Sequence, residues 1–159
     1  MSAIQQALGL LVITGICFAV AGIGSWFMPA ALSGWFITLN KPSWNPPNWV
    51  FGPVWSMLYL FMAIAAWLVW RQLGWSGAVV PLALFAMQLL LNGAWTGLFF
   101  GLRKPWIAFA EIVLLWCAIL ATLFSFWRVK PLAGWMLVPY LLWVTFAAVL
   151  NLTLARMNP

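Results

Sequence analysis

Residues 39–59 read LNKPSWNPPNWVFGPVWSMLY, and this stretch decides the fold of the chain. The adjacent prolines Pro46 and Pro47 exclude a helix interior, because proline lacks a backbone donor and clashes with the preceding turn. The residue before each proline is also pushed toward extended geometry. From Val50 onward the chain is continuously apolar. We therefore interpret the stretch as a stiff, aromatic-rich loop that packs onto the start of a membrane helix.

The composition is that of a polytopic membrane protein. Of the 159 residues, 67% are hydrophobic and 5% are charged, with a mean hydropathy of +1.06, which is typical of the membrane class. The net charge of +6 comes from seven lysines and arginines against one acid. These bases stand singly or in pairs between apolar runs, as helix-end anchors do, so we expect no nucleic-acid partner. Histidine is absent and both cysteines lie inside apolar runs; we therefore expect no metal, disulfide framework or cofactor.

Five apolar runs are each long enough to cross a bilayer, which takes about 20 residues. They cover residues 5–27, 47–70, 79–100, 105–127 and 131–154. We therefore predict an all-α membrane protein, a single domain over residues 1–159, built as a bundle of five transmembrane helices. The first run lacks a basic flank and a clear cleavage site, so we expect it to be retained. The long connection between the first two helices should cap a pocket. The bases are divided almost evenly between the two ends of the bundle, so they do not decide its orientation.

Unusual residues from three predicted helices meet at one depth. At 1.5 Å per residue, Trp55 and Asn92 each lie about 12 Å from the long-loop side, and Trp143 about 16 Å. Helical spacing places further residues on the same faces as Asn92 and Trp143. These are Gln88, Trp95, Ala147 and Leu150. The convergence predicts a cavity with aromatic walls and an amide pair, which matches the general character of ligand pockets.

Simpler interpretations of the same residues remain open. Gln88 and Asn92 could serve only to bond neighbouring helices, since intramembrane amides often contribute about 1 kcal/mol in this way. The three tryptophans could be ordinary core, because large aromatic side chains bury well without a ligand. Taken one residue at a time, helix contact and core packing are the better interpretations.

The stretch at residues 39–59 closely resembles the signature of the translocator protein and tryptophan-rich sensory protein family, the peripheral-type benzodiazepine receptors. Further matches are QLLLNGAW at 88–95, FFG at 99–101 and VPYLLW at 138–143. The resemblance implies a site for porphyrins and drug-like ligands at Trp55, Asn92, Trp143 and Ala147, closed by Trp35 and Phe36. The expected ligand-binding residues are thus Trp35, Phe36, Pro46, Trp55, Gln88, Asn92, Trp95, Trp143, Ala147 and Leu150.

The resemblance implies a membrane protein that binds, transports or senses porphyrins, such as protoporphyrin IX or haem intermediates. One alternative is an enzyme that degrades protoporphyrin with light and oxygen, in which Trp55 and Trp143 would be the redox residues. Ordinary catalysis lacks support, because the sequence offers no nucleophile–base pair or nucleotide motif. Another alternative is a sterol-binding or structural membrane partner. Animal members carry a sterol pattern that requires tyrosine where this chain has Leu152, which weakens the sterol interpretation. We expect a bacterial cell membrane, or the mitochondrial outer membrane if the source is eukaryotic.

Two further features carry expectations of their own. Gly93, Gly97 and Gly101 form a small-xxx-small ridge, which lets helix backbones approach closely. Because the family commonly dimerises, we favour a homodimer interface at this ridge over a contact within the chain. Glu111 is the only acid and lies inside an apolar run, where a charge is expensive. We favour structural pairing of Glu111 with Arg103 or Lys104 over a ligand role.

Overall fold

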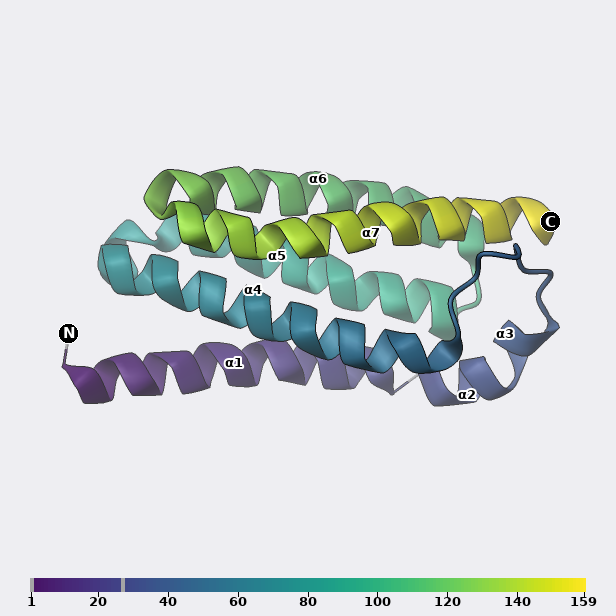
Figure 1. Ribbon diagram of the computed structural model, residues 1–159, viewed down its shortest axis with the longest axis horizontal. Coiled ribbons are helices and arrows are strands. Elements are labelled where there is room, and N and C mark those ends of the chain that lie inside the picture. Colours follow the sequence, from purple (N-terminus) through teal and green to yellow (C-terminus); the bar gives the residue numbers. More distant parts are fainter. Residues whose placement is uncertain (1, 27) are drawn as a thin grey trace.

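The computed structural model describes residues 2–26 and 28–159, and their regular structure is entirely helical. Five segments are long and apolar enough to cross a membrane. Their long helices are α1 (Ala3–Ser25), α4 (Asn48–Gly77), α5 (Val79–Thr96), α6 (Pro105–Val129) and α7 (Pro131–Met157). Figure 1 shows these helices running roughly parallel to one long axis, with the chain ends at opposite ends of the bundle. The chain is an integral, multi-pass membrane protein, as the composition predicts.

Several helix starts follow directly from local sequence. Ser2 caps α1 in a reciprocal arrangement: its hydroxyl accepts from the Gln5 backbone N–H at 3.2 Å, and its own N–H donates to the Gln5 side chain at 2.8 Å. Pro105 and Pro131 open α6 and α7, where the missing donor costs nothing. A single residue, Lys130, separates α6 from α7, so these two helices form a tight antiparallel hairpin.

The second span is longer than residues 47–70. Helix α4 continues through Gly77, although Gly74 has φ 67° and ψ −177° and interrupts the helical backbone. Arg71 and Gln72 follow the apolar run and resemble a loop in sequence, but both residue types favour helices, and a continued helix satisfies their backbone groups. The break at Gly74 needs a residue that tolerates positive φ. It also brings Trp75 to 5.2 Å from Trp70, measured between ring centroids.

The third span ends in an irregular turn. After Thr96, residues Gly97–Gly101 form a π-helix, whose i→i+5 hydrogen bonds span one more residue than those of the α-helix that the spacing predicts. Single π turns inside helices occur frequently at functional sites. Phe99 and Phe100 lie in this turn and face the bundle interior, where they are 2% and 5% exposed.

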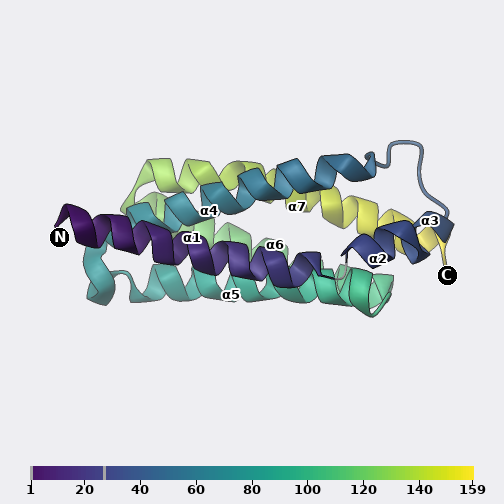
Figure 2. The ribbon, with the colours of Figure 1, turned by 90° about the horizontal axis from the view of Figure 1, so that it is seen from below.

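The long connection between the first two spans contains two short helices that the sequence did not predict. They are α2 (Met28–Ser33) and α3 (Trp35–Thr38), followed by an irregular segment that returns to α4. Phe27, the expected last residue of the first span, lies outside the described residues. Asn40 and Asn158 exchange two hydrogen bonds of 2.9 and 3.0 Å, so the irregular segment is attached to the C-terminal end of α7. Figure 2 shows α3 at the same end of the bundle as the C-terminus.

Candidate ligand-binding cavity

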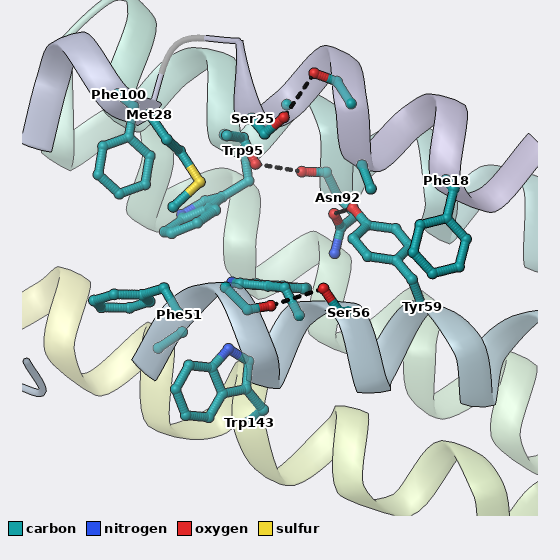
Figure 3. Close-up of a pocket in the computed structure, with 17 residues that line it drawn as sticks. Phe18, Ser25, Met28, Phe51, Ser56, Tyr59, Asn92, Trp95, Phe100 and Trp143 are labelled. Carbon is teal, nitrogen blue, oxygen red and sulfur yellow. Dashed lines mark hydrogen bonds between the residues drawn. The ribbon is translucent and has the colours of Figure 1, made fainter. Parts of the chain in front are cut away.

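A cavity of about 330 Å³ lies among α1, α4, α5 and α7 (Figure 3). Its walls are mostly apolar, with a few hydroxyl and amide groups. The lining residues are Phe18, Ala21, Gly22, Gly24, Ser25, Met28, Phe51, Gly52, Trp55, Ser56, Tyr59, Asn92, Trp95, Thr96, Phe100, Trp143 and Ala147. Each of the four long helices thus contributes a wall, and α2 contributes Met28.

Aromatic rings form much of the wall. Trp55 lies 5.8 Å from Tyr59 and 6.3 Å from Tyr140, measured between ring centroids. On the opposite side, Trp95 stacks on Phe99 at 5.3 Å with an interplanar angle of 19°. These separations lie in the range of favourable aromatic pairs. The rings therefore hold one another in place and form preformed flat surfaces.

A chain of hydrogen bonds connects the polar groups at the inner side of the cavity. The Tyr59 hydroxyl donates to Asn92 Oδ1 at 2.5 Å, and Asn92 Nδ2 donates to the Tyr140 hydroxyl at 2.8 Å. The Tyr140 hydroxyl in turn donates to Gln88 Oε1 at 2.9 Å. The two amides therefore join α4, α5 and α7, as the helix-bonding interpretation predicts. Asn92 also faces the cavity, whereas Gln88 lies beneath it and is 1% exposed.

The indole N–H of Trp143 is a donor without a protein partner. Its Nε1 is buried and has no hydrogen-bond partner among the described residues. By contrast, Trp95 Nε1 donates to Asn151 Oδ1 at 3.0 Å. Figure 3 shows the Trp143 ring entering from α7 with its nitrogen directed toward α4. A buried unpaired donor is unfavourable, and this one is covered by protein, so Trp143 presents its ring rather than its N–H to the cavity.

The structure brings together half of the residues singled out in the sequence. Trp55, Asn92, Trp95, Trp143 and Ala147 all line the cavity. Two others line a small apolar cavity of about 20 Å³ that shares some walls with the first; these are Phe36 and Leu150.

Three of the predicted site residues lie elsewhere. Gln88 is engaged in the hydrogen-bond chain below the cavity. Trp35 packs edge-on against Phe99 at 5.7 Å, and Pro46 lies on the irregular segment, where its carbonyl accepts from Asn45 Nδ2 at 3.0 Å. Helix α3 thus packs against the π turn through Trp35 and Phe36, whose rings contact Phe99.

The wall contributed by α1 was missed entirely in the sequence. Gly22, Gly24 and Ser25 stand close together in its last two turns, with Phe18 one turn earlier. This helix is hydrophobic on nearly every side, so its apolar pattern marks no inward face. The cluster of small residues near its end was the available signal.

Glu111 is not paired as predicted. Both of its carboxyl oxygens are buried and have no hydrogen-bond partner within the described residues. Arg103, one of its expected partners, has a positive φ of 55° in the turn that leads into α6. The expected pairing assumed a regular helical path back to the bases, but Lys104 is the N-cap of α6 and the helix begins only at Pro105.

The three glycines of the ridge do not share one environment. A Cβ atom added at Gly93 would lie 3.3 Å from Val20 Cγ1, so this glycine permits close contact with α1 within the chain. A Cβ added at Gly97 would meet no described atom within 4 Å. Gly101 ends the π turn, which disrupts the helical spacing from which the ridge was predicted. Of the three glycines, Gly97 is thus the one shown to have open space at its Cβ position.

Comparison with known proteins agrees with this architecture. The sequence profile of the TspO/MBR family matches residues 13–157. A tryptophan-rich protein TspO from Chlorobaculum tepidum is 45% identical over 157 residues, covering 98% of this chain and 99% of that protein. The translocator protein of Homo sapiens is 44% identical over 138 residues, covering 86% and 82%. A tryptophan-rich sensory protein from Cereibacter sphaeroides is 41% identical over 142 residues, covering 89% and 86%. The chain belongs to the TspO/MBR family.

Proposed function

We propose that this protein binds flat, hydrophobic molecules of the porphyrin type within the membrane and acts as a sensor or transporter for them. The observation that carries the proposal is the aromatic cavity enclosed by α1, α4, α5 and α7. The names of two relatives, translocator protein and tryptophan-rich sensory protein, support a transport or sensing role.

The cavity offers two kinds of recognition to such a ligand. The rings of Trp55, Trp95 and Trp143 supply faces on which a planar conjugated molecule can stack. Polar recognition would come from Asn92, whose amide lines the cavity. Asn92 already has two protein partners, so its role is to position Tyr59 and Tyr140 as well as to present an amide edge. Binding would therefore be mainly apolar, with orientation set by few polar contacts.

Titration of the purified protein with protoporphyrin, in the dark and under illumination, tests this function. We expect saturable quenching of tryptophan fluorescence in the dark, because the porphyrin would lie against several indole rings. Absence of saturable binding would refute the proposal. Products that form only under light and only with the protein would support the alternative of a degrading enzyme.

The double variant Trp55→Phe/Trp143→Phe separates binding from catalysis. Phenylalanine keeps an aromatic face but reduces the stacking area, so we expect affinity to fall by about 1 kcal/mol or less per site. Any light-dependent product should still form if the tryptophans act only as walls. Product analysis at saturating protoporphyrin is the deciding measurement. Complete loss of product with near-normal binding would identify these tryptophans as redox residues, because phenyl is far harder to oxidise than indole.

We also propose that the protein forms a homodimer in which Gly97 faces the partner. Gly97 has open space within 4 Å of its Cβ position among the described residues, and small residues favour close approach of membrane helices. Gly97→Leu should therefore shift the purified protein toward monomer without loss of helix content, as measured by cross-linking and light scattering. Gly15→Leu is the matched control, because Gly15 on α1 has equally open surroundings. An unchanged dimer in the Gly97 variant would place the interface elsewhere.

A further inference from the structure

We propose that the cavity is loaded from the bilayer, through an opening between α1 and α4 whose edges are Gly22, Ser25, Gly52 and Ser56. All four residues are exposed and all four line the cavity. Ligands that reach the cavity by this route must first dissolve in the membrane. The proposal rests on the proposed binding role. It adds the requirement that the ligand be soluble in lipid.

Helices α1 and α4 are in contact at one end and separate toward the other. Near the start of α1, Trp67 Nε1 donates to the Gln6 carbonyl at 2.9 Å. There, too, a Cβ added at Gly9 would lie 2.2 Å from the Trp70 ring. Midway along α1, the Phe18 and Tyr59 rings are 6.2 Å apart. Figure 2 shows the two helices close together near the start of α1 and farther apart toward the end at which α2 lies.

The edges of the space between the diverging ends carry glycine and serine, so the described residues there have no side chain or a small one. Cβ atoms added at Gly22 and Gly52 would meet no described atom within 4 Å. The Ser25 hydroxyl donates to the Gly22 carbonyl at 2.9 Å, and the Ser56 hydroxyl donates to the Gly52 carbonyl at 2.9 Å (Figure 3). Each hydroxyl donor is thus satisfied within its own helix. The edges therefore present little unpaired polarity, which suits contact with hydrocarbon.

The residues around the opening are those of a lipid-facing surface. Ile23 and Trp26 on the α1 side are 67% and 83% exposed, and Met57 and Leu60 on the α4 side are 45% and 43% exposed. All four are apolar, and exposed apolar side chains in a membrane protein face lipid. The opening consequently communicates with the bilayer rather than with water.

The aqueous end of the bundle is covered by the long connection. Phe36 is 2% exposed and packs against Phe99 and Phe100, with ring centroids 6.4 and 5.9 Å apart. The irregular segment is attached over α7 by the Asn40–Asn158 hydrogen bonds. Direct entry from water would require these contacts to break, whereas entry between α1 and α4 requires no such change.

A thiol placed inside the cavity can report the route of entry. In a chain carrying Cys17→Ala and Cys117→Ala, Ala147→Cys supplies the only thiol, on the α7 wall. A neutral pyrene maleimide dissolved in liposomes should label it, and a sulfonated, membrane-impermeant maleimide should label it much more slowly. Adding Gly22→Leu and Gly52→Leu should slow labelling by the neutral reagent at least about tenfold, because close-packed side chains leave no passage. The matched control Gly15→Leu should leave the rate within about twofold, because Gly15 lies on the same helix outside the cavity.

Three outcomes would contradict this route: an unchanged rate in the leucine variants, faster labelling by the sulfonated reagent, or a reduced final extent of labelling. The last would mean that the leucines fill the cavity instead of narrowing its entrance. The helix content and elution volume of the leucine variants must match those of the parent protein. If the double variant fails to fold, the single variant Gly52→Leu is used in its place. No porphyrin is used, so a failure here is distinguishable from a failure of protoporphyrin to bind.

Discussion

Ala147→Trp should abolish binding of protoporphyrin while leaving the fold intact. Ala147 lines both the main cavity and the small apolar cavity beside it, so an indole at this position would occupy the space between the aromatic walls. We expect affinity to fall at least about 100-fold, which corresponds to about 2.7 kcal/mol of binding free energy. Fluorescence titration in detergent or nanodiscs measures the loss directly.

Val149→Trp provides the matched control for this experiment. It makes the same kind of enlargement on the same helix, but Val149 is 54% exposed on the bundle surface. We expect its titration curve to match that of the parent protein. Equal affinity in both tryptophan variants would mean that the ligand binds outside this cavity, and would require a different site for the proposed function.

Gly134→Leu should be the most damaging single change to the folded protein. A Cβ added at Gly134 would lie 2.8 Å from Trp127 Cβ and 3.0 Å from Trp127 Cα. The second of these is a backbone atom, so the α6–α7 hairpin cannot accept a larger residue by moving one side chain. Overpacking of this kind typically costs about 1–3 kcal/mol, and more where the backbone must shift. We expect a large drop in thermal stability, measured as loss of monodisperse protein after heating.

Gly15→Leu again supplies the comparison, because its added side chain meets open space within 4 Å among the described residues. A midpoint that falls for Gly134→Leu but not for Gly15→Leu would assign the effect to the hairpin contact. Similar midpoints for the two variants would show that α6 and α7 separate easily, contrary to the close approach at Trp127.

The transmembrane architecture was readable from the sequence because hydropathy reports span length directly. The five spans are confirmed, and the family resemblance carried by residues 39–59 is confirmed by the match over residues 13–157. The ends of the helices were less predictable. Hydropathy falls at Arg71 although the helix continues to Gly77, because the membrane boundary and the helix boundary have different physical causes.

The candidate site was predictable only where a regular helix carried the residues. Depth and helical spacing correctly indicated that Trp55, Asn92 and Trp143 lie around one space. The same reasoning did not extend to the long connection, whose helices α2 and α3 are only six and four residues long, or to the α1 wall, whose helix is apolar all round. Helical spacing also could not predict that Gln88 would accept a hydrogen bond from Tyr140, since a partner 52 residues away depends on tertiary packing.

The π turn at Gly97–Gly101 has a consequence for how chains of this kind can change length. A π turn closes its hydrogen bonds around one more residue than an α-helical turn does. Here the turn ends the span, and only residues 102–104 separate it from the start of α6. Insertions and deletions are ordinarily confined to loops, because they displace everything that follows in a packed helix. The turn follows α5 at the end of its span, so a residue lost or gained there would be taken up in the turn and the 102–104 connection, and would reorient Phe99 and Phe100.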